Sequence, residues 1–123
     1  MKRKVSAKNI KLKRAYEPPT SDDGPRILID RLWPRGLSKK RAAIDLWMKD
    51  IAPSTELRKR FGHDPARLDE FCRRYAKEAH QHSDLLDRLR SLARQGPITL
   101  VYSARDEEHN DAVELRRLIL GTG

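Results

Sequence analysis

The sequence predicts a single α/β domain whose mainly parallel sheet is flanked by helices in Rossmann-like layers. Two continuous apolar runs, "RILID" at residues 26–30 and "ITLVY" at Ile98–Tyr102, have the length and composition of central strands covered on both faces. Helical patterns separate the two runs, and a strand-loop-helix unit follows the second. With 123 residues, the chain has the size of one domain with one core.

Residues 1–25 are predicted to form an arm, an edge strand and a loop. We expect residues 1–8 to form a flexible basic arm and residues 9–123 to form the α/β domain. "NIKLKRAY" alternates apolar residues with lysines, which is the pattern of a half-exposed strand at a sheet edge. "EPPTSDDGP", residues 17–25, is rich in turn formers and predicts a surface loop leading into the first central strand.

The segment after the first central strand is ambiguous between strand and helix. Ser38 is placed to cap a short helix. "AIDLWMKDI" then alternates apolar and other residues, so it predicts a strand, although a helix ending at "IAPS" competes. Pro53 ends the segment, whether it forms a strand or a helix.

Four further elements complete the predicted order. Ser54 caps a short helix that reaches Phe61, and Asp64 with Pro65 begins a longer helix. Another helix starts near Ser83 and ends at "QGP", and the last is capped by Asn110 or Asp111. The apolar stripe of the longer helix includes Cys72, which favours a core position over a nucleophile; its members are Leu68, Phe71, Cys72, Tyr75, Ala76 and Ala79.

The net charge of +9 is concentrated at the start of the chain. Residues 1–14 contain seven basic residues and no acidic one, so the other 20 basic residues nearly balance the 18 acidic ones. Such an arm attracts nucleic acid or an acidic partner through screened electrostatics, and the alternative is a solvated, disordered terminus. The basic residues are Lys2, Arg3, Lys4, Lys8, Lys11, Lys13 and Arg14.

Composition also predicts the compartment. The chain has no apolar run of membrane-spanning length and no secretory signal pattern, so we expect a soluble, cytoplasmic protein without membrane contact. Its one cysteine excludes an internal disulfide framework and a multi-cysteine metal site.

A ligand site is predicted where the two central strands end. In open α/β sheets, ligands bind beyond the carboxyl ends of parallel strands. "DRLWPRG" follows the first central strand, and "YSARDEEHN" includes the end of the second. If the strands are neighbours, both segments surround one crevice, whose ligand-binding candidates are Arg31, Trp33, Arg35, Tyr102, Ser103, Asp106 and Asn110.

The candidates carry distinct chemistry, and each has a structural alternative. The guanidinium forks of Arg31 and Arg35 suit phosphate or carboxylate, so an anion is the expected ligand. Trp33 could stack a base or sugar, or only pack. Asp30 and His109 are the catalytic candidates, but Asp30 could instead pair with an arginine, and His109 could instead cap the last helix.

Familiar catalytic and cofactor motifs are missing from the sequence. Ser103 lacks the G-x-S-x-G elbow of a serine hydrolase. There is no GxGxxG, no GKS or GKT phosphate loop, and no HExxH-like pair of histidines. We therefore expect neither a nucleotide cofactor nor a bound metal.

Three blocks of sequence resemble a known family. "DRLWPRG", "APSTELRKRFGHDP" and "YSARDEEHN" occur in the order found in the YeaO-like branch of domain of unknown function 488, and the similarity covers about Ile10 to Leu120. The resemblance implies a compact bacterial α/β protein and a shared surface that adds Pro34, Gly36, His63 and Asp64 to the candidates above. The wider family carries a cysteine-containing loop where this chain has Tyr102, Ser103 and Ala104, so thiol chemistry is not carried over.

Three functions remain open from the sequence. The first is an enzyme or binding protein for an anionic, nucleotide-like small molecule. The second is a nucleic-acid-associated or regulatory module that uses the basic arm. The third is a structural or interaction protein in which the candidate residues tie loops together without a ligand. The reaction and the oligomeric state are not predicted.

Overall fold

The computed structural model describes residues 5–61, 64–105 and 110–121. Four parallel strands form one sheet in the order β1-β4-β2-β3, so the predicted α/β fold is confirmed. The strands are β1 (Ile10–Arg14), β2 (Arg26–Leu28), β3 (Leu46–Trp47) and β4 (Ile98–Tyr102). The helices are α1 (Lys39–Ala42), α2 (Thr55–Phe61), α3 (Leu68–His80), α4 (Ser83–Gln95) and α5 (Asp111–Leu120).

The two apolar runs are neighbouring central strands, as the ligand-site prediction required. β4 lies between β1 and β2, with Leu100 opposite Leu12 on one side and Ile27 on the other. The amide of Ile29 also donates to the carbonyl of Val101 (3.1 Å), which extends the pairing beyond Leu28. The strand ends of both predicted site segments therefore lie side by side.

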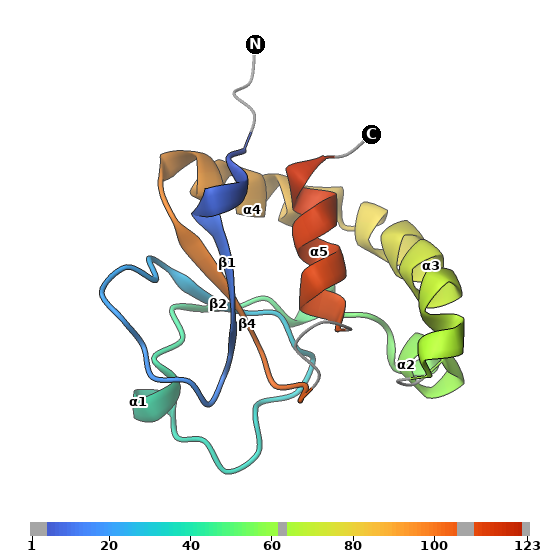
Figure 1. Cartoon of the computed structure of the whole chain (residues 1–123), viewed down its shortest axis with the longest axis horizontal. Coiled ribbons are helices and arrows are strands. Elements are labelled where there is room, and N and C mark those ends of the chain that lie inside the picture. Colours follow the sequence, from blue (N-terminus) through green and yellow to red (C-terminus); the bar gives the residue numbers. More distant parts are fainter. Residues whose placement is uncertain (1–4, 62–63, 106–109, 122–123) are drawn as a thin grey trace.

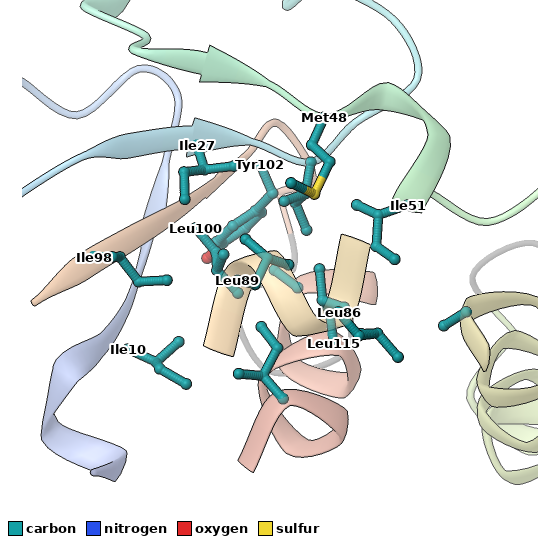
Figure 2. Close-up of a cluster of buried hydrophobic side chains, with 14 of the residues drawn as sticks. Ile10, Ile27, Met48, Ile51, Leu86, Leu89, Ile98, Leu100, Tyr102 and Leu115 are labelled. Carbon is teal, nitrogen blue, oxygen red and sulfur yellow. The ribbon is translucent and has the colours of Figure 1, made fainter. Parts of the chain in front are cut away.

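The larger helices cover one face of the sheet. α5 lies beside the strands and α3 lies beyond it, both opposite α1 in the view of Figure 1. Alternate residues of β4, such as Ile98 and Leu100, face this layer, where Leu86 and Leu89 of α4 and Leu115 of α5 meet them (Figure 2). This period-two alternation between the faces is a consequence of strand geometry.

Loops and the single turn of α1 cover the opposite face. Leu28 and Val101 are buried there, under the partly buried side chains Trp33, Leu37, Ile44 and Trp47. The ring of Trp33 meets that of Trp47 edge to face, with 5.6 Å between centroids. In the ambiguous segment the predicted strand is limited to Leu46–Trp47, which pair with β2, and Lys49–Ile51 form a 3-10 turn.

The loop between β1 and β2 is fastened by a buried ion pair. The side chain of Arg26 donates to Asp23 (2.7 Å) and to the carbonyl of Ala42 (3.1 Å). Lys13 approaches the other oxygen of Asp23 (2.8 Å). Burial raises the pKa of Asp23, but hydrogen bonds from Lys13, Thr20 and Arg26 outweigh it and hold the pKa well below its ordinary value.

Most helix starts follow the predicted caps. Ser38 accepts from the amide of Arg41 (3.1 Å), Ser54 from Leu57 (3.1 Å), and Asn110 from Val113 (3.1 Å). The long helix differs, because Asp64 accepts from Ala66 and Pro65–Arg67 first forms a 3-10 turn before α3 begins at Leu68. Residues 7–9 also form a 3-10 turn, and Arg116 donates to the carbonyl of Ala7; the boundary of the arm stays a prediction.

Candidate functional site

Asp30 joins the ends of the two central strands. One oxygen of its carboxylate, Oδ2, accepts from the amide of Ser103 (2.8 Å) and from the Ser103 hydroxyl (2.7 Å). The Asp30 side chain is buried, and the indole of Trp47 donates to its carbonyl (2.7 Å). The structure therefore brings these two predicted residues together, in an arrangement that fixes the direction in which the chain leaves β4.

Arg31 points away from that contact, toward the segment that precedes α2. Its guanidinium donates to the carbonyls of Ala52 (3.2 Å) and Pro53 (3.5 Å). It also lines a small cavity of about 140 Å³. The other lining residues are Asp50, Ile51, Ala52, Ser54, Glu78, Gln81 and His82.

Trp33 lies on the opposite face of the sheet from the large helices. The indole of Trp33 donates to the carbonyl of Leu37 (2.6 Å) within the cluster that covers Leu28 and Val101. The Arg35 side chain is exposed. The predicted crevice is thus divided, because Arg31 and Trp33 make their contacts with different segments of the chain.

The remaining candidates come from the second predicted segment. Tyr102 is buried in the core between the sheet and the helices, and Asn110 is the N-cap of α5. Asp106 and His109 lie outside the described residues, as does His63. The roles suggested for these three side chains stay predictions.

Asp111 is a buried carboxylate that the sequence did not mark as functional. It begins α5, only 8% of its surface is exposed, and its Oδ2 has no hydrogen-bond partner among the residues that the structure describes. Burial and the negative charge of Asp30 raise its pKa to about 6, against the opposing effect of Arg58. The strand ends are therefore acidic at their centre, which does not favour an anion at that point.

Cys72 is half-buried in α3, whereas the apolar stripe predicted a core position for it. Burial, together with the nearby carboxylate of Glu114, raises the pKa of the thiol from 9.0 to about 11. Since the thiolate is the reactive form, this environment makes Cys72 a poor nucleophile.

We therefore expect Cys72 to react with iodoacetamide at pH 8 about 100-fold more slowly in the folded protein than in the urea-unfolded chain, because the folded thiolate fraction is lower. Mass spectrometry of samples quenched over time measures both rates. A folded-state rate equal to the unfolded rate would contradict the high pKa.

A larger cleft lies between α2 and α3, next to the small cavity. Its volume is about 460 Å³, and Ser54 and Glu78 line both spaces. Glu78 accepts from the amide (2.8 Å) and the hydroxyl (2.6 Å) of Ser54, which holds the start of α2 against α3. The lining consists of Ser54, Glu56, Leu57, Arg60, Glu70, Arg73, Arg74, Lys77 and Glu78.

The cleft presents four basic side chains. Arg74 pairs with Glu70 one turn earlier (3.2 Å), whereas Arg73 and Lys77 are exposed and have no ion-pair partner within the described part of the chain. Arg73 and Lys77 are four residues apart, so both lie on one side of α3. That spacing is visible in the sequence, but the approach of Arg60 on α2 depends on tertiary packing and could not be predicted from it.

The described residues contain neither a metal-binding cluster nor a membrane-spanning helix. Among them, no group of three or more histidine, cysteine or carboxylate side chains is placed to hold a metal ion. Within the same ranges, no helix has the length and apolar character needed to span a membrane.

These features define a small parallel α/β protein with a closed strand-end contact and a basic cleft beside it. The chain belongs to the family described as the inactive N3 subclade of DUF488, which it matches over residues 9–122. It is 46% identical over 107 residues to the uncharacterized protein YeaO of Escherichia coli K12, covering 87% of this chain and 93% of that one. It is 38% identical over 117 residues to uncharacterized proteins Rv3073c of Mycobacterium tuberculosis H37Rv and Mb3100c of Mycobacterium bovis, covering 95% of this chain and 98% of theirs. No solved structure matches the chain significantly.

Proposed function

We propose that this protein binds an anionic small molecule in the cleft between α2 and α3, beside the carboxyl edge of the sheet. The observation that carries the proposal is the pair Arg73 and Lys77, two exposed cations without an ion-pair partner among the described residues that face a cleft of about 460 Å³. That volume lies within the range of small-molecule sites.

The lining favours a phosphorylated ligand that also carries hydroxyl groups. Guanidinium groups bind phosphate or carboxylate oxygens through paired hydrogen bonds, and the Lys77 ammonium adds a point charge. The carboxylate of Glu56 is an acceptor suited to a hydroxyl group. A sugar phosphate offers both kinds of partner, and the described lining includes no aromatic ring on which a nucleobase could stack.

The strand-end residues support binding without turnover. In this proposal Asp30 positions Ser103 at the end of β4, and Arg31 positions the Ala52–Pro53 backbone from which α2 starts. The high pKa of Cys72 offers no thiolate for catalysis. The description of the family as inactive agrees with a binding role.

A titration with glucose 6-phosphate, pyrophosphate and citrate at low salt tests the proposal by isothermal calorimetry. We expect binding of at least one probe and, for the double variant Arg73→Gln and Lys77→Gln, a dissociation constant at least about 10-fold higher, as loss of charge-assisted hydrogen bonds implies. The matched control, Lys59→Gln with Arg88→Gln, removes the same charge from exposed positions outside the cleft. Absence of binding by all three probes, or equal weakening in both double variants, would overturn the proposal.

A structural role is the second candidate for several predicted site residues. Asp30, Arg31, Trp33 and Asn110 each have hydrogen-bond partners within the chain. The contacts of Asp30 and Arg31 join separate segments of the chain, whereas those of Trp33 and Asn110 are local. The four side chains therefore stabilise the carboxyl edge whether or not a ligand binds.

A further inference from the structure

The basic residues of β1 are occupied within the fold. Lys11 pairs with Asp22 (2.8 Å), and Lys13 pairs with the buried Asp23 (2.8 Å). Arg14 donates to the carbonyls of Ala104 (3.0 Å) and Ser103 (3.4 Å). Of the predicted arm, Lys2, Arg3 and Lys4 lie outside the described residues. A polyanion would therefore have to compete with these contacts for the three cations of β1.

A second run of basic residues, in and just before α1, does not form such ion pairs among the described residues. Arg35, Lys39, Lys40 and Arg41 are exposed, and their side chains have no ion-pair partner in the part of the chain that is described. No acidic residue occurs between Arg31 and Ile44. Four positive charges within seven residues therefore face solvent, and no acidic residue of this stretch balances them.

The backbone beneath these cations is held in place. Ser38 caps α1 at the amide of Arg41 (3.1 Å), and the amide of Leu37 donates to the carbonyl of Pro34 (3.3 Å). Ala42 is buried, and its carbonyl accepts from the buried Arg26 (3.1 Å). The cations thus project from a fixed turn, which lowers the conformational cost of binding through them.

An exposed aromatic ring lies next to this run. The hydroxyl of Tyr16 donates to the carbonyl of Arg35 (3.0 Å), and the guanidinium of Arg14 lies 5.4 Å from the ring centroid. Tyr16 nevertheless remains 46% exposed. Tyr16, Arg35, Lys39, Lys40 and Arg41 together are called the α1 surface below.

We infer that the α1 surface binds single-stranded nucleic acid, with the four cations on backbone phosphates and Tyr16 stacking on a base. Fixed cations beside an exposed ring are the elements of sequence-independent single-strand binding. α1 has only four residues and cannot enter a duplex groove as a recognition helix does. The inference goes beyond the small-molecule cleft, because α1 and α2 lie on opposite sides of the molecule in Figure 1.

The test is fluorescence anisotropy of a labelled oligothymidylate of roughly 12 nucleotides, a length within the range of known single-strand sites, at several salt concentrations. The variant Lys39→Ala, Lys40→Ala and Arg41→Ala is compared with a charge-matched control, Lys59→Ala, Arg88→Ala and Arg117→Ala, whose wild-type side chains are also exposed and lie outside the predicted basic arm. For three lost phosphate contacts on a single strand, we expect the slope of log affinity against log salt to become shallower by about 2. The control should keep most of the slope.

Tyr16→Leu separates stacking from charge. It should weaken binding of the oligothymidylate severalfold while leaving binding of inorganic polyphosphate unchanged, because polyphosphate has no base to stack. The inference is overturned if the oligothymidylate does not bind, if both triple variants lose the same slope, or if a duplex of equal length or a polyglutamate peptide binds more tightly. Thermal unfolding of each variant checks that the fold is retained.

Discussion

Replacing Gly24 with alanine is expected to lower the free energy of unfolding by about 2–4 kcal/mol, the sum of an overpacked contact and a strained backbone. The backbone at Gly24 has a φ of 63°, where a residue with a side chain is strained. An alanine Cβ there would overlap the carbonyl oxygen of Pro97 and lie 2.9 Å from its carbonyl carbon. Because Pro97 directly precedes β4, the overlap cannot be relieved by moving a flexible side chain.

The backbone around Gly24 leaves little room to adjust. The amide of Thr99 donates to the carbonyl of Pro25 (2.9 Å), and the Thr99 hydroxyl donates to the carbonyl of Asp23 (2.8 Å). A shift of this loop would therefore break hydrogen bonds that join it to the central strand. The expected decrease in the free energy of unfolding therefore comes both from the overlap with Pro97 and from strain on these hydrogen bonds.

Gly36→Ala provides the matched control and isolates the backbone cost. Gly36 also has a positive φ, 76°, but a Cβ there meets nothing within 4 Å. Its replacement should cost only about 1 kcal/mol. Urea unfolding monitored by circular dichroism measures both variants, and equal losses would show that contact with Pro97 contributes nothing.

Asp111→Asn should stabilise the protein at neutral pH by about 1–2 kcal/mol. The pKa of Asp111 is raised from 3.8 to about 6, so the folded state holds this proton more tightly than the unfolded chain does. The unfolded chain releases the proton first as pH rises, and stability falls between about pH 4 and about pH 6, by about 3 kcal/mol at most. Asparagine cannot ionise and avoids this loss, although it gives up a favourable charge at the start of α5.

The decisive quantity is how the stability difference between variant and wild type changes with pH. The difference should be small near pH 4, where the wild-type carboxyl is protonated in the folded state, and should grow until about pH 7. Asp84→Asn removes an exposed carboxylate from the first turn of α4, where burial does not oppose the charge, so this control should not stabilise the protein at neutral pH. If the difference for Asp111→Asn were the same at pH 4 and pH 8, burial and the charge of Asp30 would not raise the pKa of Asp111 as stated.

Local sequence patterns were sufficient for most of the fold. "ITLVY" is β4 with the expected bounds, because an apolar run of strand length between Gly-Pro and a polar loop has few other solutions. Ser38, Ser54 and Asn110 cap helices as predicted, since capping depends on residues three positions apart. The strand order was not predictable, because the pairing of β1 with β4 joins residues far apart in the sequence.

The site was harder to predict for the same reason. The sequence grouped Asp30 and Ser103 at one edge of the sheet on the condition that the two central strands are neighbours, and the structure meets that condition. The sequence could not show that Arg31 and Trp33, which are two residues apart, form hydrogen bonds with different segments of the chain. The sequence analysis did not select Arg73 and Lys77, because only the packing of α2 against α3 places them beside a cleft.

The position of β4 in the sheet has a consequence for the order of folding. β4 is the last strand in the chain, yet it separates β1 from β2 and pairs with both. During synthesis, β1 therefore stays unpaired until the almost 90 residues between Ile10 and Ile98 have been made. Closing such a loop is slow, and unpaired strand edges are prone to aggregate. The lysines that alternate along β1 then protect the nascent chain as well as the finished sheet edge, because charges on an open edge discourage pairing with another chain.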